Sequence, residues 1–354
     1  MISAIRIGRF TISADQDPFV IAEMSGNHNQ ELGRALELVR AAAKAGAHAL
    51  KLQTYTADTM TIDVRDGQFL ITDKSSPWYG ETLYSLYQKA NTPWEWHKPI
   101  FDLATELGMV AFSSPFDRTA VDHLESLGAL AYKIASFELT DHELVACVAK
   151  TGKPVIMSTG MASVVEIGES VAVARANGCR DLILLKCTSA YPSTAEDANL
   201  ATIPVLRDTF DCQVGLSDHS MGLAVPATAV ALGATVIEKH LTLRRADGGV
   251  DSTFSLEPEE FSDLVRTVRE SRRAIGKTTF GGSSSEMTSQ SHRRSLFVVK
   301  DIKAGEIVRE EHIRSIRPGG GMPIKFLKAV VGMRAQRDAA RGEPVSWDLF
   351  RPKG

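Results

Sequence analysis

Short runs of β-branched and other apolar residues recur between longer helical patterns along the first 275 residues. This alternation is typical of βα units and therefore of an α/β fold with a parallel sheet. The stretches between the runs are amphipathic, and several end in glycine, as helices commonly do. Eight such units in roughly 250 residues predict a (β/α)8 TIM barrel, whose functional residues lie at the carboxyl ends of the strands. The predicted strands are Phe19–Met24, His48–Gln53, Met109–Ser113, Ala131–Ala135, Pro154–Ser158, Leu182–Cys187, Gln213–Leu216 and Thr235–Lys239.

Composition narrows the class of protein. The chain has 354 residues, of which 44% are hydrophobic and 23% charged, as in an ordinary globular protein. A net charge of -3 gives no bulk attraction to nucleic acid or to an anionic membrane, so we expect neither as a partner. The four cysteines lack metal-finger spacing, and no apolar run predicts secretion or membrane spanning. We therefore expect a cytoplasmic enzyme with reduced thiols.

The ends of the predicted strands carry polar side chains. Because the carboxyl ends of parallel barrel strands meet on one side, these side chains should line a common mouth. Three are lysines, which are rarely buried unless they are paired or bind an anion. We expect a cationic, hydroxyl-rich mouth suited to phosphate or carboxylate. The strand-end residues are Glu23, Lys51, Gln53, Ser113, Ser114, Lys133, Ser136, Ser158, Lys186, Thr188, Ser217, His219, Glu238 and His240.

Two of these residues, His219 and His240, follow the last two predicted strands. If these strands are neighbours, both imidazoles lie in the mouth and can hold a divalent metal. Two protein ligands with open remaining positions describe a catalytic metal better than a structural one. The alternative is that the histidines are two unconnected polar residues at strand ends.

The connection after the second strand, residues 54–92, is far longer than an ordinary βα loop. Residues 78–96 hold six of the ten Trp and Tyr residues of the chain. Such a segment is either a lid over the mouth, which stacks on a sugar or excludes water, or a hydrophobic plug against the rim or a partner subunit. The sequence leaves both open.

We expect the barrel domain to cover residues 1–275. Residues 276–291 are rich in Gly, Ser and Thr and lack periodicity, so they predict a flexible linker. Residues 292–354 predict a small second domain, in which Lys303–Glu306 and Ala340–Glu343 form matching turns that lead into short strands.

Eight motifs, in this order, resemble those of the sialic acid (nonulosonic acid) synthase family, whose members condense phosphoenolpyruvate with an amino sugar. The resemblance covers essentially the whole chain and implies a C-terminal SAF domain, similar to type III antifreeze protein. The motifs are AEMSGNHN (22–29), KLQTYT (51–56), SSPFD (113–117), KIAS (133–136), STGM (158–161), KCTSAYP (186–192), GLSDHS (215–220) and EKHLT (238–242).

The resemblance also implies roles for individual residues. Glu23, His219 and His240 would be catalytic, and the two histidines would bind Mn2+ or Mg2+, of which Mn2+ suits imidazole better. Phosphoenolpyruvate would be bound by Lys51, Ser114, Lys133, Ser136, Ser158, Ser189 and Ser217, and the sugar by Glu138, Tyr191, Asp251 and Arg317. The family often has Thr where Ser114 stands and Asn where Ser189 stands. Any of these serines can instead cap the helix after its strand, and Asp251 can cap a loop.

Arg317 would be supplied by the SAF domain of the partner in a domain-swapped homodimer. An arginine before Pro-Gly-Gly-Gly is otherwise an ordinary loop residue. The Gly/Ser-rich linker makes such an exchange sterically easy.

Within the family, the variants EMSGNHN, KLQTYTADTM and TLYSLYQKANTPWEWH are most similar to the pseudaminic acid synthases. The implied sugar is 2,4-diacetamido-2,4,6-trideoxy-L-altrose. The alternative is an N-acetylneuraminate or legionaminic acid synthase that uses N-acetylmannosamine or its 2,4-diacetamido-6-deoxy analogue. Two other classes also stay open: a metal-dependent aldolase or hydrolase on the same barrel, and a non-catalytic protein that binds carbohydrate or ice.

Overall fold

The computed structural model describes residues 2–74 and 76–350, and the chain divides into two compact units, Met1–Gly276 and Lys277–Gly354. In the first unit, eight parallel strands close into a barrel. Each coincides with a predicted strand, so the prediction of a TIM barrel is confirmed. In chain order the strands are β3 (Phe19–Glu23), β4 (Ala49–Thr54), β5 (Val110–Pro115), β6 (Tyr132–Ile134), β7 (Val155–Ser158), β8 (Leu182–Cys187), β9 (Gln213–Asp218) and β10 (Val236–His240), and β10 pairs with β3 to close the ring.

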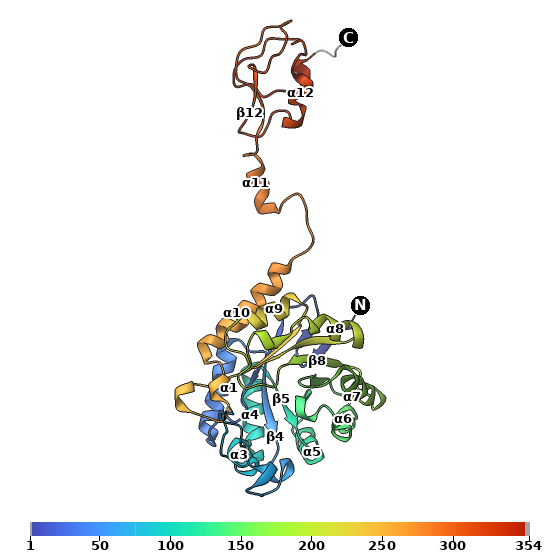
Figure 1. Cartoon of the computed structure of the whole chain (residues 1–354), viewed down its shortest axis with the longest axis vertical. Coiled ribbons are helices and arrows are strands. Elements are labelled where there is room, and N and C mark those ends of the chain that lie inside the picture. The colour runs from blue at the N-terminus through green and yellow to red at the C-terminus, as the bar shows by residue number, and fades with distance from the viewer. Residues whose placement is uncertain (1, 75, 351–354) are drawn as a thin grey trace. The chain divides into compact units, whose positions relative to one another are not determined.

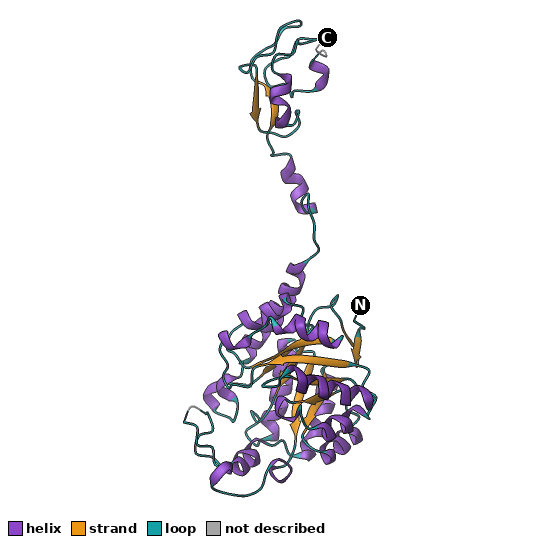
Figure 2. Cartoon of the chain, turned by 45° about the vertical axis from the view of Figure 1, so that its right-hand side comes forward, coloured by secondary structure: helices purple, strands orange, loops and turns teal. Residues whose placement is uncertain are grey.

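Helices surround the strands (Figures 1 and 2). One long helix follows each barrel strand, and α10 closes the ring by packing against both α9 and α1. The buried residues of α1, for example, are Ala35, Leu38, Val39, Ala42 and Ala45, which recur at helical spacing and face the outside of the sheet. The eight helices are α1 (Leu32–Ala45), α4 (Trp94–Glu106), α5 (Arg118–Ser126), α6 (His142–Ala149), α7 (Val164–Ala176), α8 (Thr202–Phe210), α9 (Ala224–Ala231) and α10 (Pro258–Ile275).

The period of two along each strand separates an outer core from an inner one. In β10, Ile237 belongs to the cluster that packs under the helices, whereas Val236 belongs to the cluster inside the barrel. The inner cluster also contains isoleucines of the hairpin β1 (Ile5–Ile7) and β2 (Phe10–Ile12), which covers the amino-terminal end of the barrel. The inner face is thus apolar where the strands begin, and the polar residues lie where they end.

The long connection after β4 is partly helical. It contains α2 (Ala57–Met60), a 3-10 turn (Gly67–Phe69) and α3 (Leu83–Ala90). Between them, a bridge from Leu70 to Thr82 and the backbone hydrogen bond from the N–H of Ile71 to the carbonyl of Glu81 make a hairpin. The described residues of the connection therefore contain regular structure and lie on one side of the barrel.

The second unit has a small core around β11 (Ser295–Val298), β12 (Ile313–Ile316) and α12 (Leu327–Val330). Both predicted turns are present: the N–H of Lys303 donates to Glu306, and the N–H of Ala340 donates to Glu343. Residues 276–291, which the sequence predicts to be a linker, are more regular than their lack of periodicity suggests, because they contain α11 (Met287–Gln290) after a turn capped by Ser283 and Glu286. The assignment of residues 276–291 as a linker stays a prediction.

Within the described ranges 2–74 and 76–350, no helix is both long and apolar enough to cross a membrane. All four cysteines are free thiols.

Candidate active site

A buried ion-pair cluster fills the carboxyl-terminal side of the barrel interior. Lys51 Nζ lies 2.7 Å from Glu23 Oε2 and 3.6 Å from Glu238 Oε1, and Lys133 Nζ lies 3.3 Å from the same Glu238 oxygen. Ser217 Oγ also donates to that oxygen, at 3.2 Å. These residues come from β3, β4, β6, β9 and β10, so the closed barrel brings together residues far apart in sequence. Two of the three predicted lysines, Lys51 and Lys133, thus lie in this mouth together with two glutamates. The third, Lys186, is on the outer face of β8 with Leu184 and donates to the carbonyl of Cys187 and to Thr188.

The pKa values of the two glutamates are shifted in opposite directions. Burial raises the pKa of Glu23; Lys51 opposes this shift and Glu238 adds to it. Burial also acts to raise the pKa of Glu238, but the charges of Lys133 and Lys51 outweigh it and hold that pKa below its usual value. Carboxyl groups whose pKa values are pushed apart in this way suit different tasks. Glu238 remains ionised and holds the lysines, whereas Glu23 can exchange a proton.

The lysines are also shifted. For Lys51, burial acts to lower the pKa, but the charges of Glu23 and Glu238 raise it overall. For Lys133, burial dominates and lowers the pKa. Both side chains are almost fully buried, at 3% and 2% exposure, so an anion that enters the mouth meets them with little competing water.

Hydroxyl groups lie beside this cluster. Lys51 Nζ donates to Ser114 Oγ at 3.4 Å, and the backbone N–H of Gly160 donates to Ser136 Oγ at 3.1 Å. A Cβ added to Gly160 would overlap Ser189 Oγ and Ser136 Oγ, so glycine lets these two hydroxyls keep their present positions. Ser158 Oγ is buried and has no hydrogen-bond partner among the described residues. The arrangement has hydroxyl donors available for a phosphate or carboxylate.

The two histidines are neighbours at the mouth. His240 ends β10 and His219 follows β9, and their ring centroids lie 5.2 Å apart. His219 Nδ1 lies 3.0 Å from the carbonyl oxygen of Thr188. Because a carbonyl only accepts, this ring nitrogen carries a proton. The sequence-based expectation that the rings share one mouth is met.

The surroundings of the histidines allow a metal without defining a closed site. Burial and the nearby His219 lower the pKa of His240 well below its usual value, so its ring is neutral, and His240 Nδ1 is buried without a hydrogen-bond partner in the described part of the chain. An uncharged imidazole with an unused nitrogen fits a metal ligand. No group of three or more His, Cys, Asp or Glu side chains with metal-binding geometry occurs within residues 2–74 and 76–350. Two histidines alone would leave positions for water and substrate.

A thiol contacts the same histidine. Burial acts to raise the pKa of Cys187, but a hydrogen bond from His219 lowers it to about 7. The pKa of His219 is raised, because the interactions with Cys187 outweigh the lowering effect of burial. Metal binding would require a neutral imidazole and would therefore displace a proton from this pair.

Acidic residues lie on the other side of the histidines. Asp251 Oδ2 lies 3.9 Å from His240 Nδ1 and accepts a hydrogen bond from the Ser25 hydroxyl. Gln53 Nε2 donates to Glu23 Oε1 at 3.0 Å and to Ser25 Oγ at 3.1 Å, so a polar chain connects Asp251 with Glu23. Burial raises the pKa of Asp251, which the bond from Ser25 opposes.

Glu138 follows Ser136 in a short 3-10 helix and, unlike Glu23 and Glu238, has no ion-pair partner within residues 2–74 and 76–350. Its Oε2 is buried without a hydrogen-bond partner among the described residues. Burial raises its pKa to about 7. A neutral Glu138 can donate a hydrogen bond to a substrate hydroxyl or amide.

Aromatic rings cover the histidines. Tyr191 lies 4.5 Å from His219 and 5.2 Å from Phe254, measured between ring centroids. Trp78, from the long connection, lies 5.8 Å from Tyr191, and its indole N–H donates to the carbonyl of Val250 at 2.8 Å. Tyr55, at the start of the connection, packs against Phe116 in the loop after β5, with their ring centroids 5.1 Å apart. Rings of the segment thus lie both beside Tyr191 and against a barrel loop.

A second ion pair lies on the outer face of the strands that carry the histidines. Lys239 Nζ donates to both Asp218 and the carbonyl of Ser220, and Asp218 accepts from the backbone N–H of Ser220 at 2.9 Å. Lys239 and Asp218 are register partners in β10 and β9, and each precedes a histidine. This pair ties together the two strand ends from which His219 and His240 project.

Arg317 lies in the second unit, directly after β12, and is exposed. Its role at a barrel of a second copy stays a prediction.

Several residues at the mouth were not among the candidate site residues. Glu238, which holds both lysines, stands among the polar strand ends, and its place two residues before His240 puts it on the same face of β10. Strand alternation would have identified it. Ser25 and Phe254 follow no such pattern, because their loops bring them to the site.

The comparisons with known proteins agree with this geometry. The model of the NeuB family matches residues 38–280, and that of the SAF domain matches residues 293–351. The chain belongs to the NeuB family. The predicted resemblance to the sialic acid synthases is thereby confirmed, and so is the prediction of a SAF domain at the C-terminus.

Members of the NeuB family resemble the chain over nearly its whole length. It is 42% identical to a pseudaminic acid synthase of Campylobacter jejuni over 98% of this chain and 100% of that protein. It is 41% identical to a pseudaminic acid synthase of Helicobacter pylori over 94% of this chain and 98% of that one. Among solved structures, an N-acetylneuraminic acid synthetase of Leptospira borgpetersenii is 31% identical, with a TM-score of 0.72, over 82% of this chain and 95% of that one.

Proposed function

We propose that this chain is a pseudaminic acid synthase, which condenses phosphoenolpyruvate with 2,4-diacetamido-2,4,6-trideoxy-L-altrose and water to give pseudaminic acid and phosphate. The observation that carries a condensing function is the pair of buried lysines, Lys51 and Lys133, in the same mouth as the adjacent rings of His219 and His240. The choice of sugar is supported by the higher identity to the two pseudaminic acid synthases than to the N-acetylneuraminic acid synthetase. An N-acetylneuraminate or legionaminic acid synthase is the alternative.

The lysine side of the mouth would bind phosphoenolpyruvate. Lys51 and Lys133 neutralise its charge, and hydroxyls of Ser114, Ser136, Ser158, Ser189 and Ser217 donate hydrogen bonds. Glu238 keeps the two lysines in place and charged before the substrate arrives. A cation that is already fixed needs little reorganisation when an anion binds.

The histidine side would bind the open-chain aldehyde. C3 of phosphoenolpyruvate forms a bond to the aldehyde carbon, and the aldehyde oxygen takes up a proton. Water then adds at C2, and the C2–O bond to phosphate breaks as the new hydroxyl loses its proton and becomes a ketone. Glu23, with its raised pKa, is the group placed to move protons in these steps. Glu138, Tyr191 and Asp251 would orient the sugar.

His219 and His240 would hold a divalent metal, Mn2+ or Mg2+. When bound, such an ion supplies Lewis-acid polarisation of a carbonyl oxygen. The two rings lie 5.2 Å apart, and the carbonyl of Thr188 holds that of His219 in place.

Arg317 of a second copy would complete the site in a domain-swapped homodimer. The arginine is exposed, and as a guanidinium it suits the carboxylate or polar groups of the substrate. Mixing Arg317→Ala with Glu23→Ala protein tests this proposal, because half of the sites in a heterodimer would be intact. Partial recovery of activity is expected. Heterodimers that form without any recovery would contradict a shared site.

The cytoplasm is the compartment that we propose, because all four cysteines are free.

A phosphate-release assay tests the function. The purified protein is incubated with phosphoenolpyruvate, Mn2+ and one of three sugars: the diacetamido altrose, N-acetylmannosamine or the diacetamido mannose analogue. We expect fastest release with the altrose, and loss of activity on chelation and in His219→Ala or His240→Ala. Fastest release with a mannose sugar supports the alternative synthases. An aldolase or hydrolase would act without phosphoenolpyruvate, and a binding protein would release no phosphate.

A further inference from the structure

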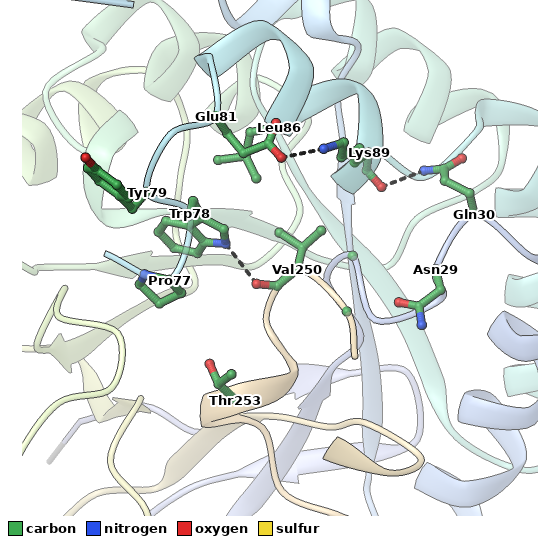
Figure 3. A pocket seen from close by; sticks show the side chains of 12 residues that line it. Asn29, Gln30, Pro77, Trp78, Tyr79, Glu81, Leu86, Lys89, Val250 and Thr253 are labelled. Carbon is green, nitrogen blue, oxygen red and sulfur yellow. Dashed lines mark hydrogen bonds and ion pairs between the residues drawn. The ribbon is translucent and has the colours of Figure 1, made fainter. Parts of the chain in front are cut away.

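A cavity of about 460 Å³ lies beside the mouth, between the hairpin of the long connection and two barrel loops (Figure 3). The connection contributes Trp78, Tyr79 and Leu86 to its wall, and the loops after β3 and β10 contribute Asn29, Val250 and Thr253. None of these residues takes part in the proposed chemistry. The cavity is therefore distinct from the part of the mouth where the reaction is proposed to occur.

Two structural connections place this cavity next to the histidines. Trp78 lines it, and the ring of Trp78 lies 5.8 Å from Tyr191, which in turn lies 4.5 Å from His219. Val250, whose carbonyl holds the Trp78 indole at 2.8 Å, directly precedes Asp251. Because Trp78 and the loop of Asp251 belong to both, a group in the cavity would lie just beyond a ligand held at the histidines.

The polarity of the cavity differs from that of the mouth. Its two charged lining residues, Lys89 and Glu81, are paired with each other at 2.5 Å, so among the described residues no unpaired cation lines it. Leu86, Val250 and the ring of Trp78 offer apolar surface. Gln30 uses its amide N–H groups on the carbonyls of Lys89 and Asn91, at 3.0 and 2.6 Å, which leaves its amide oxygen to accept. Such a wall suits a neutral amphipathic group better than a phosphate or carboxylate.

We propose that this cavity binds the acetamido group at C4 of the sugar and that Trp78 forms the wall that determines specificity for it. This inference rests on the proposed function, because it takes the aldehyde at C1 to lie at the histidines. The methyl of an acetamido group matches the apolar surface, and its N–H can donate to the amide oxygen of Gln30. Its carbonyl can accept from the hydroxyl of Thr253, which also lines the cavity. A sugar with a hydroxyl at C4 would leave the cavity empty.

The test compares two sugars of the same stereochemistry: 2,4-diacetamido-2,4,6-trideoxy-L-altrose and 2-acetamido-2,6-dideoxy-L-altrose, which has a hydroxyl at C4. We expect the wild type to prefer the first in kcat/KM by about 10- to 200-fold, the range that one substituent in a pocket provides. Trp78→Ala should reduce this preference at least tenfold, because kcat/KM for the diacetamido sugar falls. The kcat/KM for the hydroxyl analogue should stay within about threefold of the wild-type value.

Two further variants make the outcome decisive. Thr253→Trp places bulk in the cavity from an exposed position, so it should fold and also lose the preference. Tyr84→Ala removes another aromatic ring of the same connection that does not line this cavity, and should keep the preference. If the wild type is active and the folded Trp78→Ala and Thr253→Trp proteins keep its preference for the diacetamido sugar, this inference is wrong, but the proposed function is not. A wild type that releases no phosphate with either sugar overturns the proposed function itself.

Discussion

Strand β10 has a buried charged residue on each of its faces, Glu238 on the inner one and Lys239 on the outer one, and the two have different partners. Glu238 faces the barrel interior, where it holds Lys51 and Lys133 and has one carboxylate oxygen without a hydrogen-bond partner in the described residues. Lys239 faces outward, where Asp218 and the carbonyl of Ser220 occupy it. Both side chains are at most 3% exposed. Burial and ion pairing therefore do not by themselves identify a functional charge, because both residues have them.

The largest expected effect concerns the inner cluster. Lys133→Met should lower kcat/KM for phosphoenolpyruvate at least a thousandfold, because the transition state loses a fixed cation in a low-dielectric site. Glu238 would still be paired with Lys51, so the melting temperature should change little. Phosphate release and thermal unfolding measure the two quantities. Near-normal kcat/KM in a folded Lys133→Met protein would show that this lysine is structural.

The outer pair should show the opposite behaviour. Lys239→Met leaves Asp218 buried without its cation and should reduce the free energy of unfolding by roughly 3 kcal/mol, as measured with denaturant. The double variant Lys239→Met with Asp218→Asn should recover most of that loss, because no unpaired charge remains. If the single variant is as stable as the wild type, the comparison between the two faces fails.

Ligand binding should distinguish the clusters again. Phosphoenolpyruvate at 100 times its Kd should stabilise the wild type by about 2.7 kcal/mol, since it binds only the folded chain. Lys133→Met should lose this stabilisation at the same ligand concentration. The Lys239→Met, Asp218→Asn double variant is the matched control and should retain it. Equal ligand-induced shifts in melting temperature for all three proteins would contradict the assignment.

The smallest effect concerns Glu138, which has no lysine at ion-pair distance in the part of the chain that the structure describes. Burial raises its pKa from 4.5 to about 7, whereas the lysines lower that of Glu238. A raised carboxyl pKa stabilises the folded chain below pH 4.5, and this contribution disappears as the pH rises to 7. The free energy of unfolding of the free enzyme should therefore fall by about 2 kcal/mol between these pH values because of Glu138, and Glu138→Gln should abolish that part of the pH dependence. An unchanged pH profile of denaturant unfolding would refute it.

The sequence predicts the barrel well, because its signals are local. Each strand is a short apolar run, and the period of two places Glu23, Lys51, Lys133, Ser217 and His240 on the inner face of their strands. The same rule predicts that Glu238 lies beside His240 and that Lys239 does not. Recognising Glu238 as part of the site needed only this alternation.

The contacts at the mouth are less predictable. Trp78 and Tyr191 are separated by more than 100 residues, and only the fold of the connection brings their rings within 5.8 Å. The same holds for Ser25 and Asp251, which come from the loops after the first and last barrel strands. Loop conformation depends on tertiary packing rather than on local pattern.

By itself, the sequence determines the eight βα units, the polar strand ends and the resemblance to a family of condensing enzymes, because these depend on residue type and spacing. The tertiary structure decides which charges are free to act. Closing β10 onto β3 places Glu238 between two lysines and buries Glu23, which raises the pKa of Glu23. The next residue along β10, Lys239, lies on the outer face and is paired with Asp218. Free energies of burial and pairing depend on neighbours in space, and the sequence specifies those only through the fold.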